Sequence, residues 1–172
     1  KDFVAKVRDA YQKCIDEFYK SRKPELQKFV SDVFMKLINN KKLYEGIVIT
    51  DEWEMWVKYY DGTLLPTWSY GPSAGGAQIV ATAFIAGLNK FARVDAPVVI
   101  DTPLARLDDI HRINILKYYN KMSAQVIILY TPAEINDANQ AILEDNVNEH
   151  HEIISIEDVP DLSRIIPYEG SN

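Results

Sequence analysis

The sequence predicts an α/β fold with a parallel sheet at its core, a small antiparallel hairpin and an amphipathic helix at the N-terminal end. Residues 97–100 (PVVI) and 125–130 (QVIILY) are short apolar runs, and a helical pattern separates them. A strand, a crossover helix and a second strand form a βαβ unit, so we expect the two strands to be parallel neighbours. The unbroken apolar run at 97–100 also predicts a strand buried on both faces.

The first forty residues predict two helices. We expect residues 21–24 (SRKP) to end the first helix, because Pro24 suits the first turn of the next one, which ends near residues 39–40. The first helix is either an amphipathic helix packed on its own domain or the stub of a coiled coil. Its apolar residues recur at 3-4 spacing over two heptads, at Val4, Val7, Tyr11, Cys14 and Phe18. Cys14 is therefore expected to pack rather than to react.

Residues 44–60 alternate between apolar and polar and predict strands. Asp61-Gly62 is a turn signal, and residues 63–65 follow it as a further short strand before Pro66. Four aromatic residues of this region either pair across the small sheet or offer a stacking surface for bases, and the first interpretation is the more frequent one in proteins. They are Trp53, Trp56, Tyr59 and Tyr60.

A helix is predicted from about Ser73 to Leu88. Ser73 is a good N-cap, and the small residues Ala74, Gly75 and Gly76 let the backbone approach a ligand closely. The unpaired N–H groups at such a helix start attract phosphate oxygens. The alternative is a glycine-rich helix start that packs closely on a strand.

Asp101 follows the strand at 97–100 and lies at its carboxyl end, where parallel α/β sheets bind ligands. Asp108 or Asp109 is expected to cap the next helix, on which His111 is expected to be a surface residue. A helix from Pro132 to about residue 143 and a strand near 152–156 complete the pattern. The tail from Asp158 has no clear pattern, and adjacent His150 and His151 are assigned no metal because neighbouring strand residues point to opposite faces.

The composition is that of a globular chain of 172 residues, 47% hydrophobic and 26% charged. No apolar run approaches the ~20 residues of a membrane helix, so we expect no membrane partner. The net charge of −6 argues against a stand-alone DNA-binding surface. A single cysteine excludes an internal disulfide and suits a reducing, cytoplasmic location.

Four motifs in order resemble the C-terminal lobe of an SMC-like ABC-type ATPase head over about residues 43–135. The segment SAGGAQ is similar to the signature loop, VVIDTP to the Walker-B strand and LARLD to the D-loop, and the strand VIILY follows. The sequence resembles in particular the DndD-like ATPase of DNA-sulfur-modification systems and the ATPase that partners the double-strand-break nuclease. The resemblance implies a coiled-coil stub at 1–22 and the ATPase lobe at 23–172. No Gly-x-x-x-x-Gly-Lys-Ser/Thr loop is present, which implies that a P-loop lobe N-terminal to the coiled coil completes the site.

The resemblance also assigns roles. It implies that Asp101 holds Mg²⁺ through water while the phosphates of ATP supply other ligands, and that Asp101 and Thr102 lie at the catalytic centre. It implies that the signature residues contact the γ-phosphate on the partner head; these are Ser73, Ala74, Gly75, Gly76 and Gln78. It implies that two D-loop residues contact the opposite subunit; these are Arg106 and Asp108. Two positions depart from the family: Thr102 stands where most members have the glutamate that orients water, and Thr131 stands where many have a histidine that senses the γ-phosphate.

The expected function is that of a head that hydrolyses ATP only together with its P-loop lobe and that dimerises with a second head. Through the full complex it would act on DNA, with a nuclease or restriction partner, in DNA repair or in DNA-modification-dependent restriction. The alternative is an ATP-gated clamp with little or no hydrolysis, because a threonine hydroxyl cannot act as the missing base. A structural α/β domain with accidental motifs is the third reading.

Overall fold

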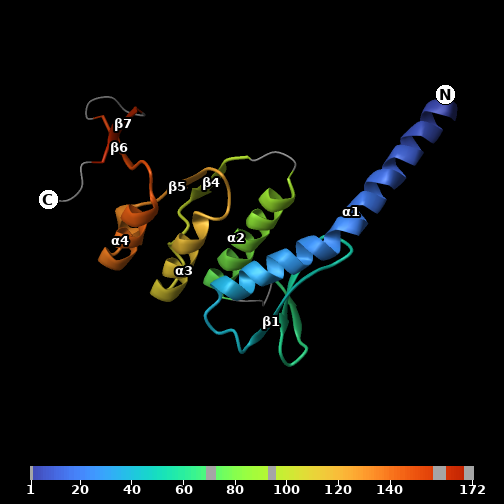
Figure 1. Ribbon diagram of the computed structural model, residues 1–172, viewed down its shortest axis with the longest axis horizontal. Helices are drawn as coiled ribbons and strands as arrows, with labels where there is room; N and C mark the ends of the chain where they lie inside the picture. Colours follow the sequence, from blue (N-terminus) through green and yellow to red (C-terminus); the bar gives the residue numbers. More distant parts are fainter. Residues whose placement is uncertain (1, 69–72, 93–95, 157–161, 169–172) are drawn as a thin grey trace.

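The computed structural model describes residues 2–68, 73–92, 96–156 and 162–168 (Figure 1). A long N-terminal helix leads into a body in which helices pack beside small sheets. The elements are α1 (Asp2–Leu37), β1 (Tyr44–Ile49), β2 (Met55–Tyr59), β3 (Leu64–Pro66), α2 (Ala74–Phe91), β4 (Val98–Asp101), α3 (Asp109–Tyr119), β5 (Val126–Leu129), the 3₁₀ helix η1 (Pro132–Glu134), α4 (Asp137–Asn146), β6 (His151–Ser155) and β7 (Ser163–Pro167).

Helix α1 is continuous over 36 residues with Pro24 inside it, so the predicted break at 21–24 is wrong. Contacts with the first hairpin hold the helix there, because the Lys23 ammonium binds the Asp51 carboxylate and the carbonyl of Thr50. The boundary between 22 and 23 therefore falls within one helix, and the division into a stub and a lobe stays a prediction.

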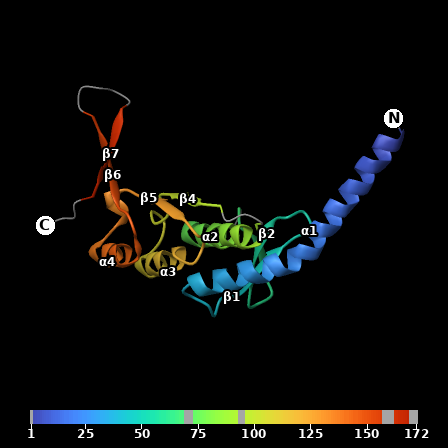
Figure 2. The same ribbon diagram turned by 45° about the horizontal axis from the view of Figure 1, so that its top comes forward.

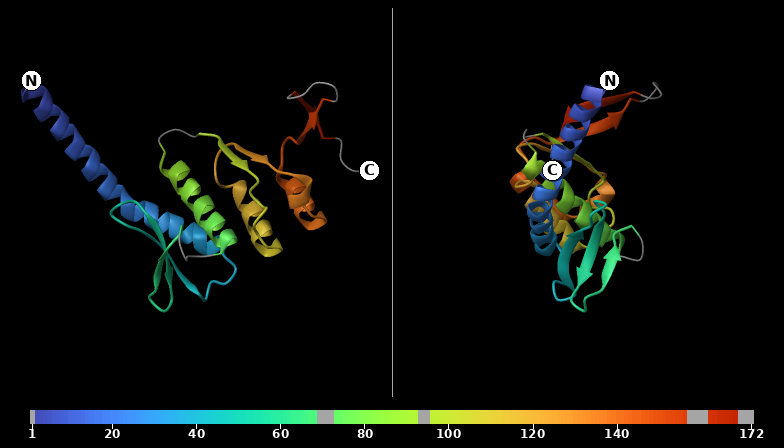
Figure 3. Two further views of the ribbon diagram at one scale, coloured as in Figure 1. Left: turned by 180° about the vertical axis from the view of Figure 1, so that it is seen from behind. Right: turned by 90° about the vertical axis from the view of Figure 1, so that its right-hand side faces the viewer.

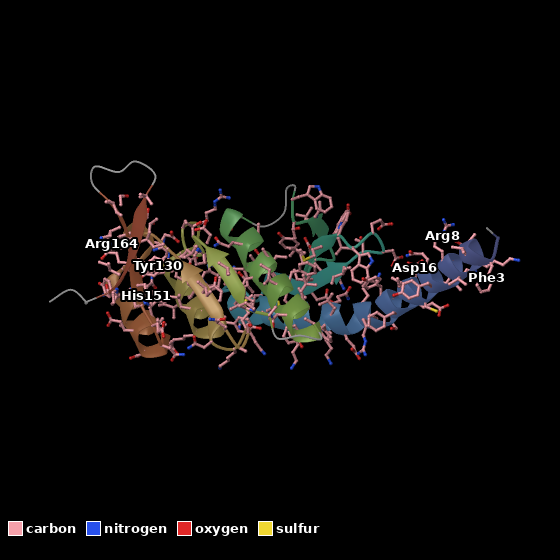
Figure 4. All side chains as sticks on the ribbon, turned by 90° about the horizontal axis from the view of Figure 1, so that it is seen from above. Phe3, Arg8, Asp16, Tyr130, His151 and Arg164 are labelled. Carbon is pink, nitrogen blue, oxygen red and sulfur yellow. The ribbon has the colours of Figure 1, made fainter. Side chains whose placement is uncertain are left out.

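The N-terminal half of α1 projects from the body (Figures 1 and 4), and Figure 4 labels Phe3, Arg8 and Asp16 along it. Its heptad residues are exposed: Val4 is 71% accessible and Tyr11 is 70% accessible. Cys14 is exposed as well, so the expectation that it packs is wrong within this chain. The reason is that no described element of the body reaches this part of the helix.

The C-terminal half of α1 packs on the antiparallel sheet β1-β2-β3 and on α2. Two α1 side chains cover the free edge of β1: the Ser31 hydroxyl accepts the amide of Ile47 at 3.0 Å and the Gln27 carbonyl accepts that of Ile49 at 2.8 Å. The predicted strands within 44–60 and at 63–65 are confirmed. The main core lies here, formed by Val30, Val33, Phe34, Leu37, Ile47, Val57, Ile79, Val80 and Ala83.

The predicted βαβ unit is also present. Strands β4 and β5 are parallel neighbours, with Val98 opposite Val126 and Asp101 opposite Leu129, and α3 connects them. Helices α2, α3 and α4 all lie on one side of this pair (Figures 2 and 3). The other face is open, since Val99 is 61% accessible and Ile127 is 42% accessible. The expectation of a strand buried on both faces is therefore wrong for the described residues, because only one layer of helices covers the pair.

The C-terminal part differs from expectation in two places. The single helix expected from Pro132 is divided into η1 and α4, because Asn136 caps a new helix by accepting the amide of Asn139 at 3.0 Å. The tail contains β7, which pairs antiparallel with the expected strand β6, whereas Asp158 lies outside the described residues. No helix in the described part of the chain has both the length and the apolar character to cross a membrane.

Candidate functional site

The start of α2 is built as the sequence predicts. Ser73 is the N-cap, and its hydroxyl accepts the amide of Gly76 at 3.3 Å. Gly75 faces the D-loop backbone, since a Cβ added there would lie 2.8 Å from the carbonyl oxygen of Arg106. The glycine-rich start therefore packs closely on the D-loop rather than on a strand. Ala74 is the first residue of the helix.

Strand β4 ends in Asp101, which is exposed. Side chains alternate along a strand, so Asp101 belongs to the open face of the β4–β5 pair together with Val99. Thr102 follows in the left-handed region, with φ at 47°, and its amide donates to the carbonyl of Leu129 at 2.8 Å. A β-branched residue in this region is strained by roughly 1–3 kcal/mol. The strain lies directly beside the predicted metal ligand.

A cavity of about 660 Å³ opens beside this turn. Four of the residues singled out from the sequence line it together, from α2, from the end of β4, from the D-loop and from the end of β5: Gln78, Thr102, Arg106 and Thr131. The lining also includes Ala77, Ala105, Arg112, Ala133 and Glu134. Ser73, Asp101 and Asp108 do not line it. The structure thus gathers part of the predicted set around one cavity, and the rest of the set lies outside its lining.

Sequence reasoning missed Arg112 and Glu134. Glu134 is only 4% accessible, and its carboxylate accepts the amide of Leu104 at 3.1 Å and the amide and hydroxyl of Thr131 at 3.3 and 3.2 Å. The spacing Thr131-Pro-Ala-Glu134 matches the Ser/Thr-x-x-Glu pattern of a capping box, which is a signal that would have found it. Arg112 gives no comparable sequence signal.

Asp108 caps α3, as expected, and its surroundings correct the expectation for His111. The His111 side chain is only 16% accessible, and its ring lies 2.7 Å from the Asp108 carboxylate. The amide of Asn39, just beyond α1, donates to the other ring nitrogen at 3.2 Å. Partial burial raises the pKa of Asp108, but hydrogen bonds from His111 and Asn39 outweigh it, so that the pKa of Asp108 lies below its usual value.

His150 has an aromatic environment. Its ring stacks on that of Tyr168 with 4.0 Å between centroids, and its Nε2 lies 2.6 Å from the Tyr130 hydroxyl. Figure 4 shows Tyr130 and His151 at the base of the β6–β7 hairpin. Among the described residues no three His, Cys, Asp or Glu side chains gather as metal ligands.

Asp101 alone therefore represents the predicted magnesium site. Mg²⁺ keeps several waters and takes one or two protein carboxylates beside substrate phosphates, so a single exposed carboxylate at a strand end fits this ion in the presence of a phosphate ligand. It does not form a stand-alone protein cage. The donor set fits a site shared with ATP.

No protein-family model and no curated protein matches the sequence. Solved structures do match. One chain, from work on ATP-driven dimerization and DNA-stimulated activation of SMC ATPases, superposes with a TM-score of 0.64 at 15% identity, over 90% of this chain and 89% of that one. A Smc head domain with coiled coil and joint from Pyrococcus yayanosii has a TM-score of 0.58 at 18% identity over 92% of this chain. The SMC head domain from Thermotoga maritima has a TM-score of 0.53 at 15% identity, also over 92%.

The last two comparisons cover 32% and 52% of the matched chains, so this chain spans about a third and about half of their lengths. The DndD-like subtype stays a prediction. The matched architecture includes the long N-terminal helix, the antiparallel sheet and the parallel pair. At the level of the fold, the expectation is confirmed: this chain is built like part of an SMC ATPase head domain.

Proposed function

We propose that this chain is the C-terminal half of an SMC-like ATPase, which binds and hydrolyses ATP at a head–head dimer interface to control DNA binding or processing. The observation that carries the proposal is the cavity beside the β4 and β5 ends, where Thr102 and Thr131 meet Gln78 and Arg106. Parallel α/β sheets bind their ligands at this edge. Segments far apart in the sequence thus meet where a phosphate-handling site is expected.

The open face of the β4–β5 pair supports a P-loop lobe of the same protein as the first partner. Val99 and Ile127 expose apolar surface there, and Asp101 belongs to the same face. A lobe that covered this face would bring its P-loop and the phosphates next to Asp101. Asp101 would hold Mg²⁺ through its water shell, and the ion would supply neutralisation of phosphate charge there.

The exposed heptad residues of α1 support a coiled-coil connection to that lobe. Val4, Val7 and Tyr11 form an apolar stripe that needs a second helix to be buried. Cys14 lies in the same stripe and would pack there.

A second head would meet the start of α2. Ser73 and the amides of Gly75 and Gly76 would contact the γ-phosphate of ATP held by the opposite P-loop, and the Gly76 amide would then exchange the Ser73 hydroxyl for phosphate. Arg106 and Asp108 would contact the opposite subunit. Of the matched structures, one concerns ATP-driven dimerization and another is a SmcHead bound to the C-winged helix domain of ScpA, which supports both a head dimer and an additional protein partner. We place DNA, and a nuclease or restriction protein, in that full complex.

Thr102 and Thr131 favour a second candidate, an ATP-gated clamp that dimerises with little or no hydrolysis. Both line the cavity. In the family that the sequence resembles, most members have a glutamate in place of Thr102 and many have a histidine in place of Thr131. A hydroxyl can position a water molecule but accepts no proton near neutral pH. Turnover by the complete head distinguishes the two candidates.

The test of the proposal is dimerisation of the complete head with a non-hydrolysable ATP analogue, followed by light scattering. Ser73→Arg should weaken dimerisation at least about tenfold, because the long side chain fills the space of a small hydroxyl at the phosphate. Ser73→Asp keeps a good N-cap but repels phosphate, so it should fold normally and dimerise poorly. Ser163→Arg, on exposed β7, is the matched control.

Equal dimerisation by wild type, Ser73→Arg and Ser73→Asp would contradict the proposal. In that case SAGGAQ would be only a helix start. A loss with Ser73→Arg alone would indicate crowding at the helix cap rather than contact with phosphate.

A further inference from the structure

We propose that Glu134 is a positioning residue of this site, which holds the turn after the Walker-B-like strand and the end of β5 in a fixed relation. Together with Gln78 and Arg112 it forms what we call the 103–104 hub, meaning these three side chains around the Pro103–Leu104 backbone. The inference rests on the function proposed above and deepens it. It concerns how this chain sets the geometry of its own half of the site.

The Glu134 carboxylate accepts hydrogen bonds from two separate segments of the chain. One oxygen accepts the amide of Leu104, and the other accepts both the amide and the hydroxyl of Thr131. Leu104 is fully buried and Glu134 is only 4% accessible, so in the intact chain this amide is bonded to the carboxylate. A buried amide that loses its hydrogen-bond partner is destabilising. The Glu134 carboxylate therefore links the segment at Leu104 to the segment at Thr131.

Arg112 and Gln78 complete the hub from two helices. The Arg112 guanidinium donates to the carbonyl of Leu104 at 3.1 Å and to that of Glu134 at 3.2 Å. The Gln78 amide donates to the carbonyl of Pro103. Side chains from α2, α3 and η1 thus fix two consecutive peptide groups that follow Thr102. A shift of the α2 start is transmitted to Thr102 and Thr131 through these bonds.

The contacts make Glu134 a positioning group rather than a base. Both of its oxygens accept hydrogen bonds from protein groups, so most of its acceptor capacity is used to hold Leu104 and Thr131. The Thr131 hydroxyl donates to Glu134, which leaves its oxygen lone pairs available to the cavity. Thr131 is thereby prepared to accept a hydrogen bond from water or from a protonated group. Glu134 sets the direction of that hydroxyl.

Two substitutions separate the functions of the carboxylate. Glu134→Ala removes every acceptor. Glu134→Gln keeps one acceptor oxygen for Leu104, while its NH₂ group faces Thr131 and turns that hydroxyl into an acceptor. Glu149→Gln is the matched control, because Glu149 is an exposed carboxylate outside the cavity.

The experiment measures amide hydrogen exchange in the nucleotide-free head and ATP turnover by the same complete head. Glu134→Ala should accelerate exchange at Leu104 and Thr131 at least about tenfold, while exchange at Ile79 and Val80 in the α2 core stays unchanged. Glu134→Gln should protect Leu104 as in wild type but accelerate exchange at Thr131. Both variants should lower kcat with KM for ATP nearly unchanged, because the P-loop lobe supplies most phosphate contacts.

Equal protection of Leu104 in wild type and Glu134→Ala would overturn the hub. Faster exchange throughout α2, with kcat unchanged, would show that Glu134 stabilises the fold without positioning the site, and would also overturn it. If the wild-type head dimerises but does not turn over ATP, only the proposed hydrolysis is contradicted. The hub is still tested in that case, because the exchange at Leu104 and Thr131 is measured without nucleotide. The two failures are therefore distinguishable.

Discussion

Replacing Gly75 by alanine tests how closely the start of α2 approaches the D-loop. The added Cβ would lie 2.8 Å from the carbonyl oxygen of Arg106 and 3.4 Å from Cδ2 of Leu107. Ordinary C···O contacts in proteins are about 3.3–3.6 Å, so one of the two segments must move by about 0.5 Å. The obstructing atom belongs to the backbone, and the adjacent Leu107 is buried, with its amide bonded to the carbonyl of Leu104. The D-loop therefore cannot yield at low cost.

Two effects of opposite sign act on this variant. Alanine is better than glycine within a helix by up to about 1 kcal/mol. Overpacking a tight site costs about 1–3 kcal/mol. Since the contact involves a fixed carbonyl, we expect the steric effect to be the larger, with a net loss of about 1 kcal/mol. In a chain of this size that corresponds to a decrease in Tm of about 2–4 °C.

Urea unfolding followed by circular dichroism measures the free energy of unfolding, and Ala81→Gly is the control. Ala81 is exposed on the same helix, so its replacement reports helix propensity alone and should cost about 1 kcal/mol. If Gly75→Ala instead stabilised the chain by a similar amount, the close approach of α2 to the D-loop would be refuted. The glycine would then have no packing role.

Two further predictions concern carboxylates. Asp101→Asn in the complete head should abolish Mg²⁺-dependent hydrolysis and leave the unfolding curve nearly unchanged, because this carboxylate is exposed; unchanged turnover at saturating Mg²⁺ would exclude it from the site. The pKa of Asp108 lies below its usual value of 3.8, so its contribution to stability is present above that pH and is lost as the pH falls through the lower folded value. Asp108→Asn keeps an N-cap oxygen, so the variant should fold but lose less stability than the wild type as the pH falls below about 4. Urea unfolding from pH 7 to 2 measures this, with Asp145→Asn as control. If the free energy of unfolding of Asp108→Asn fell with acid as steeply as that of the wild type, the pairing of Asp108 with His111 would be contradicted.

Elements with a strong local signal could be predicted from the sequence. The alternation in residues 44–60 and the Asp61-Gly62 turn predicted the antiparallel sheet that the structure contains. Ser73 was predicted as the N-cap of α2 and occupies that position. The parallel pair followed from two apolar runs separated by a helix. In each case the local preference and the tertiary contacts agree.

Tertiary contacts overrode the local preference at Pro24. A proline inside a helix costs about 3 kcal/mol, which is why the sequence predicts a break there. In the structure the Lys23 ammonium bonds to the hairpin, and Gln27 accepts a backbone amide of β1. These contacts follow from the approach of residues more than twenty positions apart, which a local pattern does not contain. Strand β7 was missed for the same reason, because its order comes from pairing with β6.

The candidate site was only partly predictable because its connections are long-range. Gln78 meets Pro103 across 25 positions, and Leu104 meets Glu134 across 30. Motif order indicated which segments belong together, and so Thr102 and Thr131 were among the predicted residues; both line the cavity. The side chains that fix those segments have no motif beyond the capping-box spacing of Thr131 and Glu134.

Thr102 has a strained backbone conformation, and its side chain also differs from the glutamate of most members of the resembled family. Both properties bear on how fast ATP could be hydrolysed at this turn. Its φ of 47° lies in a region that asparagine or glycine adopts with less strain than a β-branched residue. The hub holds the peptides that follow it, and the carbonyl of Leu129 holds its amide, so the surroundings fix this conformation whatever the side chain prefers. The threonine side chain is therefore not explained by the backbone, and the property that distinguishes it is a hydroxyl on a residue that lines the cavity. A hydroxyl orients water without accepting its proton, so if the complete head hydrolyses ATP as proposed, this turn would favour slow hydrolysis over rapid turnover.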